Sequence, residues 1–336
     1  MTHQPRDLEK AARPIDPAKF RNPDRTAGGE SRASVALERL DTLWINTGTL
    51  CNIACANCYI ESSPGNDRLA YFKLADALPL YDEIAALKLA TAEIGFTGGE
   101  PFMNRDLPAM MAAALERGFS VLVLTNAMRP MQRPAMKSAL LALKQRHGGR
   151  LRLRVSLDHH SRTLHECERG AGSWDPVIDG LDWLAGNGFA MAVAGRTCWG
   201  EATVTARENY RALFEARNWP LDAADPADLV LFPEMDARID VPEITTACWS
   251  ILHKNPADLM CATSRMVVKR KGQSRPAVMP CTLIAYEPAF EMGATLAQSL
   301  GADGGSFEQG AVKLNHPHCA RFCVLGGGSC SAGRQG

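Results

Sequence analysis

The chain of 336 residues is long enough for an α/β barrel with an additional module. Its 37 Lys and Arg residues balance 37 Asp and Glu residues, so no net field draws nucleic acid to the surface. No stretch approaches the roughly 20 apolar residues needed to cross a bilayer, and the first residues contain no hydrophobic signal segment. Composition therefore argues against nucleic-acid and membrane partners, and we expect a cytoplasmic protein.

The cysteine content is high for such a protein. Disulfides are rare in the cytoplasm, because thiols are kept reduced there. The 11 cysteines therefore predict that a metal ion or cluster is bound.

Along the chain, residues 1–41 are rich in Pro, Arg, Asp and Glu without apolar periodicity, which predicts a loosely held N-terminal arm. From Thr42 onward, short apolar runs alternate with amphipathic segments of helical length. The predicted strands are 42–48, 92–98, 120–126, 152–158, 189–195 and 228–234. The predicted helices lie around 76–90, 105–118, 133–147, 174–187 and 203–217.

This alternation predicts a parallel sheet covered by helices, either an open doubly wound sheet or a full or partial barrel, within a core of residues 42–240. Loops that leave the C-terminal ends of parallel strands converge on one face, so we expect the chemistry there. Residues 241–336 are dense in Cys, Gly and Pro and predict a second, irregular module.

The first predicted strand is followed by CNIACANC, which places Cys51, Cys55 and Cys58 in one loop. Three thiolates are one fewer than a structural zinc site or an ordinary four-iron cluster requires. A cubane held by three cysteines leaves one iron open to a small molecule. The alternative is a zinc ion with a fourth ligand from elsewhere in the chain.

The second predicted strand is followed by GGEP, residues 98–101. Together with the cysteine triplet, this motif resembles the radical S-adenosylmethionine (SAM) superfamily. The resemblance implies a partial (β/α)6 TIM-like barrel that holds a [4Fe-4S] cluster with an open iron and SAM. It also implies reductive cleavage of SAM to a 5′-deoxyadenosyl radical that abstracts hydrogen from a substrate, with an electron donor such as flavodoxin or ferredoxin.

The same resemblance implies which residues contact the cofactor. The GGEP element would hold the amino group of the methionine moiety. Two further elements resemble those of the family, TN (residues 125–126) after the third predicted strand and SLD (residues 156–158) after the fourth, and they would lie near the ribose and carboxylate of the cofactor. Alternatively, the polar residues of TN and SLD cap loops and helices. Asn57 departs from the family, which often has an aromatic residue there. The predicted cofactor-binding residues are Gly98, Gly99, Glu100, Pro101, Asn126, Ser156, Asp158 and Arg196.

A second set of cysteines lies in the C-terminal module. It resembles the SPASM and twitch extensions of radical SAM enzymes, although its spacing differs, and we expect one auxiliary [4Fe-4S] cluster with one spare cysteine. Zinc bound by some of these cysteines with His316 or His318 is the alternative. The predicted ligands are Cys261, Cys281, Cys319, Cys323 and Cys330.

The remaining cysteines have other interpretations. We expect Cys167 and Cys198 to be packed as small hydrophobic residues. Cys248 is either a plain buried cysteine or a catalytic hydrogen-atom donor.

Polar residues at the later strand ends predict substrate recognition, with helix caps or surface ion pairs as the alternative. Arg196 in particular has the geometry to bind a carboxylate of the cofactor or the substrate. The residues concerned are Asp158, His159, His160, Arg196, Trp199, Glu234 and Asp236.

Two classes of function follow. The first is a radical SAM oxidoreductase or tailoring enzyme, assisted by an auxiliary cluster, that acts on a small molecule or on a peptide; a peptide maturase of the kind that makes ribosomal natural products is one form of it. The second is a non-catalytic iron–sulfur carrier or a zinc-stabilised interaction module. An amine-binding loop after the second strand favours the first class.

Overall fold

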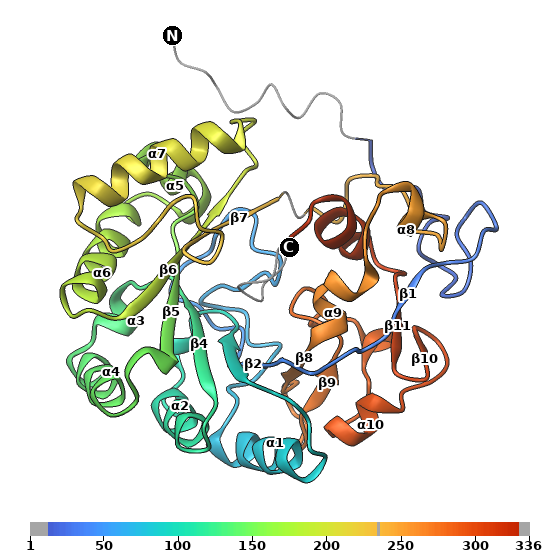
Figure 1. The fold of residues 1–336 in the computed structure, drawn as a ribbon, viewed down its shortest axis with the longest axis horizontal. Coiled ribbons are helices and arrows are strands. Elements are labelled where there is room, and N and C mark those ends of the chain that lie inside the picture. Colours follow the sequence, from blue (N-terminus) through green and yellow to red (C-terminus); the bar gives the residue numbers. More distant parts are fainter. Residues whose placement is uncertain (1–12, 234–235, 329–336) are drawn as a thin grey trace.

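The computed structural model describes residues 13–233 and 236–328. Its main sheet has the strand order β7-β6-β5-β4-β3-β2-β8-β9, in which neighbours from β7 to β8 are parallel and β9 is antiparallel to β8. The sheet curves into an open partial barrel (Figure 1), which confirms the predicted fold class. The six predicted strands correspond to β2 (Thr42–Asn46), β3 (Glu93–Thr97), β4 (Ser120–Thr125), β5 (Leu151–Ser156), β6 (Ala190–Arg196) and β7 (Leu229–Phe232).

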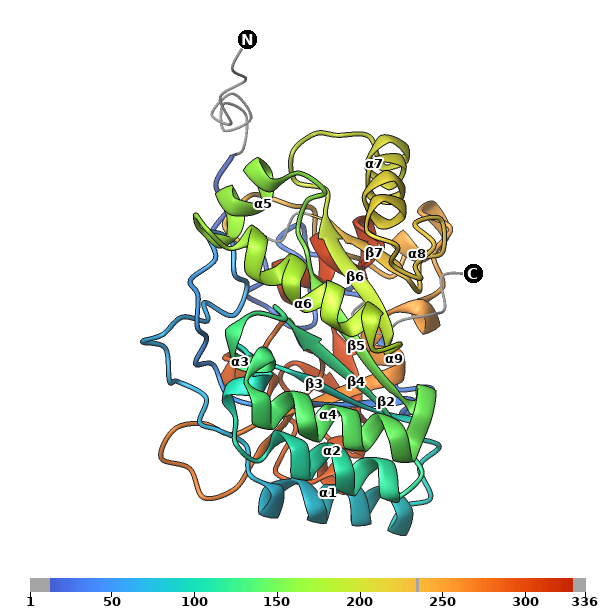
Figure 2. The ribbon, with the colours of Figure 1, turned by 90° about the vertical axis from the view of Figure 1, so that its left-hand side faces the viewer.

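Helices cover the outer face of this sheet (Figure 2). In α2, Leu107, Met110, Met111 and Leu115 recur at three- and four-residue steps and are buried, which is why the sequence pattern predicted this helix. The predicted helices correspond to α1 (Leu74–Ala86), α2 (Leu107–Glu116), α4 (Pro134–His147), α6 (Trp174–Gly186) and α7 (Thr203–Ala216). Between the strands also lie α3 (Arg129–Gln132), α5 (Arg162–Arg169) and the 3-10 turns η2 (Pro101–Met103) and η3 (Gly148–Arg150).

The C-terminal module consists of short elements, as its composition predicts. Its strand β8 pairs in parallel with β2, so the main sheet continues past residue 240, and the division into core and module stays a prediction. The elements are α8 (Cys248–Ile251), η4 (Pro256–Asp258), α9 (Met260–Thr263), β8 (Ser264–Val268), β9 (Ala277–Met279), η5 (Pro288–Phe290), α10 (Leu296–Leu300), β10 (Phe307–Glu308), β11 (Ala311–Lys313) and the π-helix η6 (Cys319–Leu325).

The described part of the N-terminal arm, residues 13–41, corrects our expectation of a loosely held segment. Its strand β1 (Ser34–Val35) pairs antiparallel with β11 (Figure 1). The guanidinium of Arg32 forms an ion pair of 2.5 Å with Glu243, and both side chains are at most 5% exposed. The polar composition was misleading because this partner lies 211 positions away in the sequence.

Candidate active site

A cavity opens at the C-terminal ends of the parallel strands. It contains about 1030 Å³ of space free of atoms, part of it open to solvent, which suits a ligand larger than a single metal ion. The structure brings together here most of the residues predicted from the first cysteine loop and the strand ends. The lining includes Cys51, Cys55, Cys58, Gly98, Gly99, Asn126, Ser156, Asp158 and Arg196.

The two glycines of GGEP are required by close contact with the cysteine loop. A Cβ on Gly99 would lie 2.2 Å from the carbonyl oxygen of Leu50, and Gly98 has φ +137. The amide of Gly99 donates to the carbonyl of Gly48 at 2.8 Å, so the two loops are joined backbone to backbone. A side chain at either position would separate the GGEP loop from the loop that carries Cys51.

The carboxylate of Glu100 is buried and hydrogen-bonded within the chain. It accepts hydrogen bonds from the amides of Phe102 at 3.1 Å and Asn126 at 2.8 Å, and from the hydroxyl of Thr125 at 2.8 Å. Burial raises the pKa of this carboxyl, and these hydrogen bonds oppose the rise. Neither Glu100 nor Pro101 lines the cavity, so Glu100 joins the ends of β3 and β4, and the surface that GGEP offers is formed by its glycines.

The thiols of the first cysteine loop are only partly accessible. Burial raises the pKa of Cys51 to about 12, and it also raises the pKa of Cys55, where the nearby charge of Arg169 opposes it. Without a metal these two thiols are therefore protonated at neutral pH. Because metal ligation needs thiolates, loading the site must release protons.

Helix α5 contributes two residues that the sequence analysis missed, Glu168 and Arg169. Both oxygens of Glu168 accept hydrogen bonds from Asn57, one from the backbone amide at 3.0 Å and one from the side-chain amide at 2.9 Å. The guanidinium of Arg196 donates to the same carboxylate at 2.7 Å. The cysteine loop is thus tied to α5 at the residue between Cys55 and Cys58.

The ion pairs of α5 also involve two of the predicted residues, Asp158 and Arg196. Arg169 donates to Asp158 at 2.6 and 3.1 Å and neutralises it. Arg196 lines the cavity and also binds the carboxylate of Glu168 within the chain, and its predicted contact with a carboxylate of the cofactor or substrate stays a prediction. Helix α5 was not predicted because only His165 and Glu168 are buried along it, and two polar residues make no apolar periodicity.

Four of the five predicted auxiliary ligands surround a second cavity. Cys261 lies in α9, Cys281 follows β9, and Cys319 and Cys323 lie one turn apart in η6. Cys330 lies outside the described residues. Burial raises the pKa of Cys261 to about 11, and burial together with the neighbouring thiols raises the pKa of Cys319 well above its usual value.

His318 lines the second cavity, whereas His316 does not. Burial lowers the pKa of His318 to about 4, and its Nδ1 has no hydrogen-bond partner in the described part of the chain. A tetrahedral zinc ion with Zn–S bonds of about 2.3 Å would hold its sulfurs about 3.8 Å apart. Among the described residues, no three of these cysteines bring their sulfurs within 4.8 Å of one another. A zinc ion at this site would therefore require these cysteines to move closer together.

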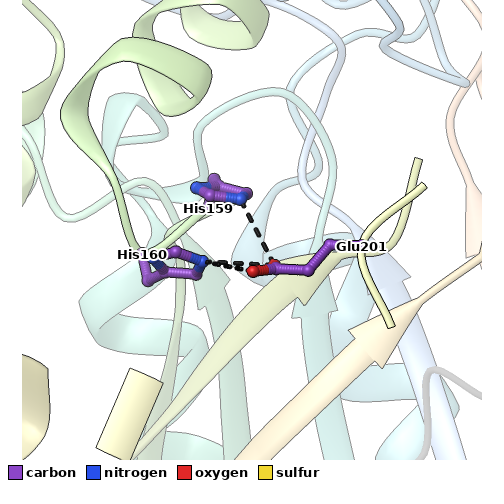
Figure 3. Close-up of side chains that lie close together, drawn as sticks. All are labelled: His159, His160 and Glu201. Carbon is purple, nitrogen blue, oxygen red and sulfur yellow. Dashed lines mark hydrogen bonds and ion pairs between the residues drawn. The ribbon is translucent and has the colours of Figure 1, made fainter. Parts of the chain in front are cut away.

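His159, His160 and Glu201 place their polar atoms within 4.8 Å of one another beyond the end of β5 (Figure 3). The group does not fit a metal ion. The backbone amide of Ser161 donates to Nδ1 of His159 at 3.0 Å, so the ring carries its proton on Nε2, the atom that faces Glu201. A protonated nitrogen cannot ligate a metal, and we interpret the group as hydrogen-bonded, with Asn209 donating to Glu201 at 2.9 Å.

The remaining predicted residues are not brought into either cavity. Cys248 contacts Thr245, with its sulfur 3.3 Å from the backbone amide, and it lines neither cavity. Cys167 is exposed on α5, which corrects our expectation of a packed cysteine; the buried side of this helix carries His165 and Glu168 instead. Asp236 pairs with Arg238.

Cys198 is half-buried, so it is less completely packed than we expected. The ring of Trp199 meets that of His159 edge to face. Glu234 lies outside the described residues.

A sequence model of the Radical SAM superfamily matches residues 45–209. The antilisterial bacteriocin subtilosin biosynthesis protein AlbA of Bacillus subtilis is 29% identical over 157 residues, which are 44% of this chain and 32% of AlbA. The mycofactocin maturase MftC of Mycobacterium tuberculosis is 28% identical over 140 residues, 42% of this chain and 33% of MftC.

Solved structures share the fold over most of the chain. Streptococcus suis SuiB bound to S-adenosylmethionine has a TM-score of 0.55 at 13% identity, covering 79% of this chain and 66% of SuiB. Native anSMEcpe with bound AdoMet has a TM-score of 0.53 at 13% identity, covering 78% of this chain and 80% of anSMEcpe. At these identities the likeness concerns the fold alone.

Residues 45–209 are thus similar to the Radical SAM superfamily, and this region contains both the cysteine loop and the GGEP loop of the cavity. The chain spans about a third of the length of the curated relatives it matches. In the described part of the chain, no helix combines the length and the apolar character needed to cross a membrane.

Proposed function

We propose that the protein is a radical SAM enzyme that binds a [4Fe-4S] cluster through Cys51, Cys55 and Cys58 and binds SAM beside it. The observation that carries the proposal is the convergence of these cysteines with Gly98 and Gly99 on one cavity at the strand ends. When bound, the cluster and SAM supply reductive cleavage of the sulfonium and hydrogen abstraction from a substrate, with an electron from a donor such as flavodoxin or ferredoxin.

The chain's own residues would bind and orient the cofactor. Gly98 and Gly99 line the cavity, and their backbone carbonyls would accept hydrogen bonds from the amino group of SAM. Asn126 and Ser156 also line this wall and would face its ribose and carboxylate. Asp158 would repel a carboxylate, but Arg169 neutralises it, so this part of the wall does not oppose an anionic group.

We propose that Cys261, Cys281, Cys319 and Cys323 hold one auxiliary [4Fe-4S] cluster, with Cys330 as the spare cysteine. Their gathering around the second cavity supports this arrangement. The weaker alternative is a zinc-stabilised module, which would use His318 with some of the same cysteines.

We propose a peptide as the substrate. AlbA and MftC are named for bacteriocin biosynthesis and for maturation, and SuiB has been solved with its precursor peptide SuiA. A small molecule remains the second candidate, because relatives of similar identity include the Fe-coproporphyrin III synthase of Methanosarcina barkeri. Deuterium transferred from a labelled peptide or small molecule into 5′-deoxyadenosine would identify the substrate class.

Anaerobic reconstitution tests the proposal. Reduced with dithionite and mixed with SAM, the protein should form 5′-deoxyadenosine, and Cys55→Ala should abolish its formation. Cys167→Ala is the matched control, because this cysteine is exposed and lines neither cavity. Undiminished cleavage by Cys55→Ala, or zinc in place of iron at the first site, would refute the assignment.

A further inference from the structure

Arg265 lies beside the second cysteine site with its side chain completely buried. It is the second residue of β8 and is 0% exposed. Its Nη1 donates to the carbonyls of Cys261 at 2.6 Å and Ser264 at 2.9 Å, and its Nη2 donates to the carbonyl of Gly310 at 3.2 Å. All of these acceptors are neutral, and its Nε is buried without a partner among the described residues.

No Asp or Glu in the described ranges forms an ion pair with Arg265. The ionisable groups that act on its charge are the thiols of Cys261 and Cys281, which are negative only when deprotonated, as they are when they ligate a metal. Arg32, the other buried arginine near this site, differs because Glu243 pairs with it. A buried charge with no opposite charge is destabilising, so a negative group bound near Arg265 would stabilise the fold.

From this contrast we infer that Arg265 is the counter-charge of an anionic cluster held by Cys261, Cys281, Cys319 and Cys323 and that it raises the reduction potential of that cluster. The inference rests on the auxiliary cluster of the proposed function. Four thiolates give the cluster a net negative charge, and reduction adds one electron from the donor without breaking a bond. A fixed positive charge nearby stabilises the reduced form more than the oxidised form.

The test uses the full-length chain in which Cys51, Cys55 and Cys58 are all replaced by Ala, so that only the second cluster can form. In this background, Arg265→Met removes the charge at similar volume and Arg265→Lys retains it. Arg207→Met is the matched control, because Arg207 also donates to backbone carbonyls, those of Ala223 and Leu229, and lines neither cavity. Iron content and the midpoint potential are measured, the latter by dithionite titration followed by electron paramagnetic resonance.

We expect Arg265→Met to weaken reduction at least tenfold, a downward shift of about 59 mV or more for one electron. Arg265→Lys should stay closer to the parent, and Arg207→Met should match it. In the metal-free protein, Arg265→Met should unfold at the same temperature as the parent or higher, because it removes an uncompensated charge.

Three results would overturn the inference in distinguishable ways. An unchanged midpoint potential at equal iron content would refute the role of Arg265 and leave the auxiliary cluster in place. Absence of iron from the parent background would refute the auxiliary cluster, and the inference with it. If Arg265→Met destabilised the metal-free and the iron-loaded protein equally, Arg265 would stabilise the fold only by packing and hydrogen bonding, and it would not act as a counter-charge of the cluster.

Discussion

Replacing Glu168 by Gln removes the negative charge that ties the first cysteine loop to α5. The carboxylate accepts bonds of 3.0 and 2.9 Å from Asn57 and of 2.7 Å from Arg196. The side chains of Glu168 and Arg196 are each 5% exposed, so solvent does not screen their interaction. Gln retains the shape and one accepting oxygen, but its amide nitrogen faces other donors.

The magnitude follows from these contacts. Hydrogen bonds to charged groups contribute about 1.5–3 kcal/mol each, and removal of one member of a buried ion pair costs about 3–5 kcal/mol. We therefore expect Glu168→Gln to lower the free energy of unfolding of the metal-free protein by about 3–5 kcal/mol in urea denaturation. A chelator should also remove iron faster from the reconstituted variant, because the loop between Cys55 and Cys58 is released.

Glu166→Gln on the same helix is the matched control. Glu166 pairs with Arg162 at 3.7 Å, and the side chain of Arg162 is 50% exposed. Such an accessible pair contributes about 1 kcal/mol or less. If Glu168→Gln and Glu166→Gln changed the free energy of unfolding and the rate of iron loss equally, the role assigned to Glu168 would be refuted.

Three further changes have defined outcomes. Gly99→Ala should abolish 5′-deoxyadenosine formation, because its Cβ would lie 2.2 Å from the carbonyl oxygen of Leu50; activity near the parent level would contradict this. Burial lowers the pKa of His165 to about 4, so the unfolded chain binds this proton at higher pH and stability falls between about pH 6.5 and 4. His165→Phe should remove roughly 3 kcal/mol of the difference in the free energy of unfolding between pH 6.5 and pH 4, measured by urea denaturation at both pH values. An unchanged difference would refute this role of His165. Cys281→Ala should reduce iron at the second site while the spectrum of the first cluster persists; unchanged iron content would indicate zinc or a spare thiol.

The predictions that succeeded rest on local patterns. Apolar runs such as residues 120–126 predicted the strands, because a strand of a parallel sheet is buried on both faces and is therefore apolar along most of its length. This pattern can be recognised in a few neighbouring residues. The positions of the cysteine triplet and GGEP after consecutive strands then placed them at one end of the sheet, where the cavity lies.

The failures share one cause as well. The N-terminal arm was expected to be loose because its sequence does not reveal that Arg32 is buried against Glu243. Helix α5 was missed because its buried Glu168 contacts Asn57 and Arg196, and the helix has no apolar stripe that a sequence pattern could show. Likewise, the GGEP motif does not reveal that the carboxylate of Glu100 accepts a hydrogen bond from the backbone amide of Asn126.

The sequence by itself determined the order of the elements, the edge of the sheet that carries the chemistry and the residues able to ligate a cluster, because hydrophobic periodicity and short motifs act over a few neighbouring positions. Only the tertiary structure decided which charges meet, as in the pairing of Glu168 with Arg196 and the placement of Arg265 beside Cys261. A charge is stable in the interior only when its partner arrives from another part of the chain, and that arrangement exists only once the chain has folded.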